Sequence, residues 1–200
     1  SITPLVKSQL ESQKLFYRKR DENQSTDFSF TRFLVPKLMG YEGWAIFMDC
    51  DMLCMTDINR LWSLRDENKA LLCVKHNHIP DSDAKFLGEK QTKYQKKNWS
   101  SLMLFNCAKC KNLTVEYVNS ASGLELHQFK WLNDDSEIGG IEDFGWNFLV
   151  DVQEIPIRQT QIDQIRLLHW TLGGPWFDKN KKFSYFDQVW FNSRNDSIRI

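Results

Sequence analysis

Short apolar runs, each closed by polar residues, alternate along this chain with stretches that have helical periodicity. The runs are Trp44–Met48, 70–74, 102–105 and 165–169. Runs of this length bounded by polar residues are typical of buried β-strands. Their alternation with helical stretches predicts an α/β fold, with a mostly parallel sheet and flanking helices. Ligands bind such a sheet at the carboxyl ends of its strands, so the residues after each run are the candidate site residues.

The length and the charge balance exclude several classes of protein. A chain of 200 residues predicts a single domain over residues 1–200. Its 26 Lys and Arg balance 26 Asp and Glu, so there is no electrostatic footprint for nucleic acid. No apolar run reaches the roughly 18–20 residues of a membrane helix, which predicts a protein that does not span a membrane.

The cysteines predict a reducing compartment, which we take to be the cytoplasm. Their number is five, which is odd, and the chain is too long to need a disulfide scaffold. Cys107 and Cys110 have the C-x-x-C spacing, but one such pair without a second is a weak signal for zinc or redox chemistry.

Two carboxylates follow the first apolar run. Asp49 and Asp51 come directly after Met48, and alternate residues of an extended chain point to the same side. Two ionised carboxylates that lie close together repel each other, and a divalent cation removes that repulsion. Oxygen ligands suit Mg²⁺ or Mn²⁺. A strand-end turn with solvated acids remains the simpler alternative for this tripeptide.

Three functions are compatible with a buried strand followed by D-x-D. One is a metal-dependent glycosyltransferase that uses a nucleotide-sugar. The second is a phosphatase of the haloacid-dehalogenase type, with Asp49 as nucleophile and Asp51 as acid and base. The third is a sugar-binding module without catalytic activity.

A histidine and two glycines follow the last apolar run. His169 ends this run, and a neutral imidazole is a metal ligand. The backbone amides of Gly173 and Gly174 can point at a phosphate, and Trp176 after a proline offers a flat wall. An ordinary turn is the alternative. Together with the acidic pair, the segment predicts a metal site that bridges a diphosphate.

These motifs resemble glycosyltransferase family 8. The resemblance rests on residues 32–36, 43–51, 57–61, 101–106, 146–147 and 169–176. It implies a GT-A fold, a divalent metal (usually Mn²⁺), a nucleotide-sugar donor such as a UDP-sugar, a glycan or polysaccharide-precursor acceptor, and retention of anomeric configuration.

The resemblance also implies roles for individual residues. Asp49 and Asp51 would serve catalysis and ligate the metal, and His169 would complete the metal site. Gln128 would lie at the position of a further catalytic residue, although His127 precedes it where the family has an aspartate. The implied donor-binding residues are Arg32, Asp49, Asn98, Ser100, Ser101, Gly173, Gly174 and Trp176.

Three departures from the family pattern stand out. The segment 169–176 is one residue shorter, and Gly174 stands where the family has a lysine that pairs with the diphosphate. Charge neutralisation then falls to the metal, backbone N–H groups, Arg32 or a lysine of the segment 77–97. Nothing before Ser25 resembles the strand that binds the nucleotide base, so we expect this chain to lack that first strand.

Overall fold

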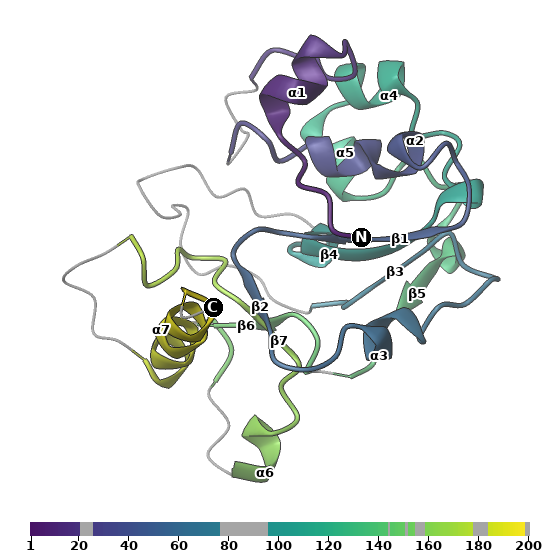
Figure 1. Ribbon diagram of the computed structural model, residues 1–200. Helices are drawn as coiled ribbons and strands as arrows, with labels where there is room; N and C mark the ends of the chain where they lie inside the picture. The colour runs from purple at the N-terminus through teal and green to yellow at the C-terminus, as the bar shows by residue number, and fades with distance from the viewer. Residues whose placement is uncertain are drawn as a thin grey trace. The chain divides into compact units, whose positions relative to one another are not determined.

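The computed structural model describes residues 1–20, 26–76, 96–143, 145–150, 152–154, 159–177 and 184–198 (Figure 1). The chain divides into two compact units. Unit 1 comprises Ser1–Met48 and Trp62–Glu142, and unit 2 comprises Asp49–Leu61 and Asp143–Ile200. Within the described ranges, no helix combines the length and the apolar character that crossing a membrane requires.

A four-stranded sheet forms the centre of unit 1. Its strands are β1 (Trp44–Met48), β4 (Leu102–Asn106), β3 (Leu71–Cys73) and β5 (Ile138–Gly140), in the order β1-β4-β3-β5. β4 is antiparallel to both of its neighbours, whereas β3 and β5 are parallel. The two inner strands, β4 and β3, carry the continuous apolar character of strands that are covered on both faces, and all of their residues are buried.

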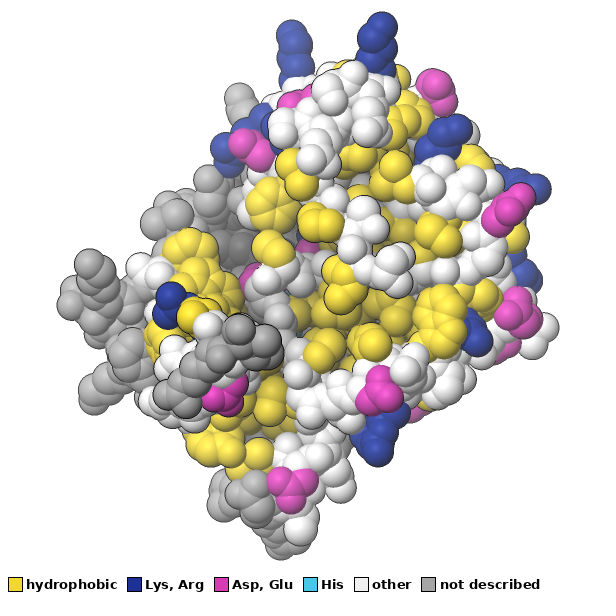
Figure 2. Space-filling view, viewed as in Figure 1, with side chains coloured by type: hydrophobic (Ala, Val, Ile, Leu, Met, Phe, Trp, Pro, Cys, Tyr) yellow, Lys and Arg dark blue, Asp and Glu magenta, His cyan; other side chains and the backbone are white. Residues whose placement is uncertain are grey.

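β1 is the strand at the edge of this sheet, and it is less buried than its apolar sequence predicts. All five of its residues are half-buried, whereas all five of β4 are buried. The space-filling view shows hydrophobic side chains reaching the surface on the face it presents (Figure 2). An apolar run therefore predicted the strand, and the order of the strands set its exposure.

Short helices cover one side of the unit 1 sheet (Figure 1). They are α1 (Lys7–Ser12), α2 (Val35–Leu38), α4 (Val115–Ser120) and α5 (Gly123–His127), with 3-10 turns at Thr31–Leu34, Trp99–Ser101, Cys107–Lys109 and Asp135–Glu137. Phe33 and Leu34 of the first 3-10 turn pack into the core. The geometry changes from 3-10 to α helix next to Pro36, and Gly40 at φ +66° ends the segment.

Unit 2 holds a three-stranded sheet and the last helix. The strands β2 (Met52–Cys54), β7 (Leu167–His169) and β6 (Phe148–Leu149) have the order β2-β7-β6. β7 is antiparallel to β2 and parallel to β6. The helices of unit 2 are α6 (Gln159–Ile162) and α7 (Tyr185–Ile198), and α3 (Asn59–Trp62) begins in this unit.

The α7 helix is attached to the end of β7 by a buried carboxylate. Asp187 is fully buried, and it accepts a hydrogen bond of 2.8 Å from the indole N–H of Trp170. It also accepts one from the backbone N–H of Ser184, whose hydroxyl accepts from the N–H of Asp187, so that the two residues form a capping box. This network connects the residue after His169 to the start of α7.

The strand directions correct the expectation of a mostly parallel sheet. Three of the five strand pairings that the described residues form are antiparallel. The reason is that a strand covered on both faces has the same apolar sequence in either direction, so the pattern reports burial and not orientation. The α/β class itself is confirmed by the mixture of sheets and helices.

The C-x-x-C pair lies in the core of unit 1. Cys107 and Cys110 are fully buried, and the Cys110 thiol donates to the backbone oxygens of Asn106 and Ala70. Burial raises the pKa of Cys107 to about 11 and that of Cys110 further. Metal binding and redox chemistry both need the thiolate, so these contacts favour reduced core thiols.

The buried thiol of Cys73 should make unit 1 sensitive to alkali. Burial raises its pKa from 9.0 to about 12, so the unfolded chain loses this proton first as the pH rises. Its contribution to stability is therefore complete at neutral pH and is lost from about pH 9 upward. As the pH rises from about 7.5 to about 10.5, the free energy of unfolding of wild type should fall by about 2 kcal/mol more than that of Cys73→Ala. Urea unfolding measures both values. Cys50→Ala, at an exposed thiol, is the control and should follow wild type.

Candidate functional site

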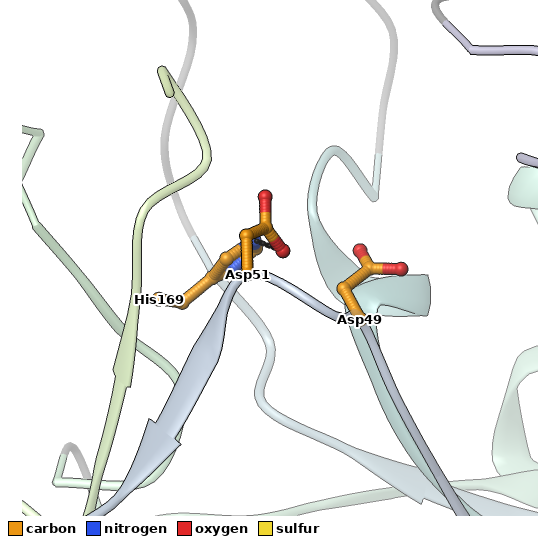
Figure 3. A group of neighbouring side chains, drawn as sticks. All are labelled: Asp49, Asp51 and His169. Atoms are coloured by element: carbon orange, nitrogen blue, oxygen red, sulfur yellow. Dashed lines mark ion pairs between the residues drawn. The ribbon is translucent and has the colours of Figure 1, made fainter. Parts of the chain in front are cut away.

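Two carboxylates and one imidazole meet in unit 2. One ligand atom each of Asp49, Asp51 and His169 lies within 4.8 Å of the other two. Figure 3 shows the carboxylates on the segment between β1 and β2, with the His169 ring beside Asp51. The Nε2 atom of His169 is 3.4 Å from Oδ1 of Asp51. The structure thus brings together the three residues that the sequence singled out.

Strand pairing explains how His169 reaches the acidic pair. In the β2–β7 ladder, Met52 lies opposite His169, so the residue before β2 lies beside the end of β7. A hydrogen bond of 3.0 Å from the N–H of Trp170 to the backbone oxygen of Asp51 extends the ladder by one step. Asp51 and His169 are therefore held next to each other by backbone hydrogen bonds, which position them independently of any ligand.

The three side chains differ in their exposure. The side chain of His169 is 2% exposed and that of Asp51 is 32% exposed, and Asp49 is half-buried. A buried imidazole below two partly exposed carboxylates presents its nitrogen and their oxygens to the same small region. This donor set suits Mn²⁺ or Mg²⁺, because carboxylate oxygens are their preferred ligands and an imidazole nitrogen suits Mn²⁺ as well.

A fourth residue contacts the histidine from its other side. Oδ1 of Asn147 lies 2.8 Å from Nδ1 of His169, and Asn147 is fully buried. Residues 146–147 belong to the motifs on which the family resemblance rests, but the sequence did not predict this contact. Trp146 is 1% exposed, which makes it an anchor.

The turn after β7 contains the predicted phosphate-facing glycines. Gly173 has φ +106°, and its N–H donates to the backbone oxygen of Trp170. A Cβ on Gly174 would lie 2.1 Å from the indole of Trp176, so the ring occupies the space of a side chain here. The fold therefore explains why glycine, and not the family lysine, stands at this position.

Trp176 belongs to an aromatic cluster of unit 2. Its ring centroid lies 4.8 Å from that of Trp190 on α7 and 6.1 Å from that of Trp170. Trp176 and Trp190 are partly buried, and both pack against the core of unit 2. Whether Trp176 also contacts a donor stays a prediction.

Arg32 of unit 1 has an evident structural role. It is 7% exposed, and its guanidinium donates to the backbone oxygens of Ser29 and Ser100, at 2.7 and 2.8 Å. The same group lies over the ring of Phe47, 4.9 Å from its centroid. These contacts attach the 3-10 turn before β4 to the helical segment around Arg32, and donor binding by Arg32 stays a prediction.

The other predicted site residues of unit 1 are bound within that unit. The hydroxyl of Ser100 lies 2.7 Å from Nδ1 of His127, and that of Ser101 donates to the backbone oxygen of Asn98. The backbone oxygen of Gln128 accepts from the ammonium of Lys96 at 2.9 Å. Their proposed roles toward a donor stay predictions. The lysines of residues 77–95 lie outside the described residues.

The fold is similar to that of a solved glycosyltransferase of the GT-A type. The crystal structure of the glycosyltransferase GlyE from Streptococcus pneumoniae TIGR4 matches 84% of this chain with a TM-score of 0.52. The sequence identity is 15%, so this likeness concerns the fold, and the match covers 43% of the GlyE chain. It confirms the predicted fold class.

Sequence comparison identifies the family. The family model for Glycosyl transferase family 8 matches residues 2–117. Protein CDI of Arabidopsis thaliana is 43% identical over 197 residues, which cover 98% of this chain and 74% of that protein. The chain belongs to glycosyl transferase family 8, as its motifs predict. The residues matched by the family model include Asp49 and Asp51 but not His169 or Asn147, so the placement of these two rests on the structure.

Proposed function

We propose that this protein is a retaining, metal-dependent hexosyltransferase that uses a nucleotide-sugar donor, with UDP as the leaving group. The acceptor would be a hydroxyl of a glycan or of a polysaccharide precursor. The observation that carries the proposal is the convergence of Asp49, Asp51 and His169 in a chain of this family. The cytoplasm remains our proposed compartment, supported by the five free cysteines.

In this proposal the three side chains hold one divalent cation, Mn²⁺ or Mg²⁺. Asp49 and Asp51 supply negatively charged oxygens, and their mutual repulsion is relieved when a cation lies between them. His169 supplies a nitrogen from the buried side. When bound, such a cation acts as a Lewis acid that stabilises the charge developing on the leaving nucleoside diphosphate.

Retention needs little further chemistry from the protein. The acceptor hydroxyl would approach the sugar from the face that the diphosphate leaves. An oxygen of the departing diphosphate then lies near the incoming hydroxyl and can take its proton, so no strongly basic side chain is required. The remaining task of the protein is to orient donor and acceptor.

The comparisons bear differently on the two alternative functions, a phosphatase and a sugar-binding module without catalytic activity. Membership in a glycosyltransferase family argues against a phosphatase that uses Asp49 as nucleophile. A sugar-binding module would keep the fold and the family motifs, and an assay has to separate it from the enzyme. Phosphatase activity on phenyl phosphate that disappears in Asp49→Asn would overturn the proposal.

A thermal-shift experiment tests the proposed donor and metal together. With Mn²⁺ already bound, UDP at about a hundred times its dissociation constant should stabilise the fold by a further ~2.7 kcal/mol. For a chain of this size that raises the melting temperature by about 5–10 °C. The shift should need both components and should vanish with EDTA, and UDP release from UDP-sugars should follow the same metal dependence. Equal shifts by UDP with and without metal would contradict the metal site.

A further inference from the structure

The position of β7 between two strands places a polar group on each side of His169. In the order β2-β7-β6, Asp51 lies immediately before β2, and Asn147 lies immediately before β6. The N–H of Val150 donates to the backbone oxygen of His169 at 2.9 Å, which holds the β6 segment against the end of β7. The imidazole is thus bracketed by Asn147 at Nδ1 and by Asp51 at Nε2.

The contact with Asn147 has a chemical consequence for the ring. An amide oxygen only accepts hydrogen bonds, so Nδ1 must carry the hydrogen that it receives. In a neutral ring, Nε2 then has no hydrogen, and its lone pair is directed at the side where Asp51 lies, 3.4 Å away. A lone pair facing a carboxylate is unfavourable by itself and becomes favourable when a cation lies between them.

We propose that Asn147 is a positioning residue that keeps His169 in the Nδ1–H tautomer, with Nε2 available to the cation shared with Asp49 and Asp51. This inference rests on the proposed function. Metal-bound histidines commonly donate their second ring nitrogen to an oxygen, which fixes the tautomer and the orientation of the ring. Here a neutral amide supplies that oxygen.

The backbone of Asn147 limits which residues can stand at this position. Its φ is +59°, in the left-handed region that side chains other than those of Gly, Asn and Asp rarely adopt. The buried indole of Trp146 on one side and β6 on the other hold the residue in place.

Two variants distinguish the effect of the amide oxygen of Asn147 from the effect of its backbone conformation. Asn147→Gly removes the side chain and tolerates a positive φ, so that a loss reports the missing oxygen rather than strain. Asn147→Asp keeps an oxygen acceptor and also tolerates this conformation. Circular dichroism and thermal melting of the metal-free proteins check that both variants fold.

The first measurement does not need metal or activity. Long-range ¹⁵N–¹H correlation spectra of ¹⁵N-histidine-labelled, metal-free protein, at a pH where the ring is neutral, report which nitrogen carries the hydrogen. We expect the Nδ1–H form for His169 in wild type and in Asn147→Asp, and a shift toward the Nε2–H form in Asn147→Gly. A wild-type ring in the Nε2–H form overturns the inference.

The second measurement is the affinity for Mn²⁺, followed by electron paramagnetic resonance. Asn147→Gly should bind Mn²⁺ about 10–100-fold more weakly than wild type, and Asn147→Asp should recover most of that loss. Wild-type affinity in Asn147→Gly overturns the inference. If wild type binds no Mn²⁺ while its tautomer depends on Asn147, the positioning role is supported and the proposed metal dependence fails.

Discussion

The variant Asp51→Asn is expected to lose about 10²–10³-fold in the rate of sugar transfer while it folds as stably as wild type. An amide is nearly the same size as the carboxylate but has no negative charge, so it is a poor ligand for a divalent cation. The Mn²⁺-dependent stabilisation by UDP should disappear with the activity. Rates of UDP release with saturating donor and melting temperatures with and without Mn²⁺ measure both effects.

The stability of metal-free Asp51→Asn separates a ligand role from a structural role. Asp49 and Asp51 lie in one cluster in which the ligand atoms are within 4.8 Å of one another. Removing one of two neighbouring negative charges relieves a repulsion on the order of 1 kcal/mol at a partly exposed site. We therefore expect an unchanged or slightly raised melting temperature without metal.

A matched control is Glu154→Gln, which removes an exposed carboxylate of unit 2 outside the cluster. It should keep the activity and the metal-dependent shift of wild type. If Asp51→Asn transfers sugar at the wild-type rate, the cluster is not the catalytic metal site. If it melts well below wild type without metal, Asp51 acts through structure.

The variant Gly145→Ala is expected to destabilise unit 2 by about 3 kcal/mol or more. A Cβ at this position would lie 2.0 Å from the backbone oxygen of Gln164. The backbone here cannot move away as a flexible side chain could. The oxygen of Gly145 accepts hydrogen bonds from the N–H groups of Arg166 and Leu167, at 2.8 and 3.1 Å, and these bonds hold the two segments together. Urea unfolding of wild type and variant measures the difference.

The effect of this change should extend to the candidate site. Gly145 stands two residues before Asn147, and its hydrogen bonds hold the segment that leads into β7 and His169. Displacing it should weaken Mn²⁺ binding as well as stability. The control is Gly140→Ala, where a Cβ would meet the mobile end of the Glu142 side chain instead, and we expect a cost within about 1 kcal/mol. Equal costs for the two variants would contradict the steric argument.

Sequence reasoning found the strands that carry a continuous apolar run. The runs at Trp44–Met48, 70–74, 102–105 and 165–169 correspond to β1, β3, β4 and β7. It missed β5, because the acids and glycines of residues 133–145 are typical of a loop. β5 exists because it pairs with β3, and a Cβ on its Gly139 would lie 2.9 Å from the side chain of Leu72. The close approach of another strand, which no local pattern reports, requires that glycine.

The sequence likewise predicted those residues of the candidate site that stand at the ends of apolar runs, and it missed the contacts that depend on the tertiary structure. Asp49, Asp51 and His169 could be singled out because each follows or ends an apolar run, where strand ends bring side chains together. The contact of Asn147 with His169 could not, since an Asn after a Trp has the same local pattern in an anchor and in a site. The filling of the space above Gly174 by Trp176 also depends on packing against α7.

The amino-acid sequence by itself determined the family, the α/β class and the three side chains on which the proposed chemistry depends, because these follow from residue types and their spacing. Only the tertiary structure decided the directions of the strands, the exposure of β1, and the pairing of β7 between β2 and β6 that brackets His169. Strand order and direction come from contacts between residues far apart in the chain. Hydrophobic periodicity indicates which residues are buried, but it does not indicate which strand they pair with.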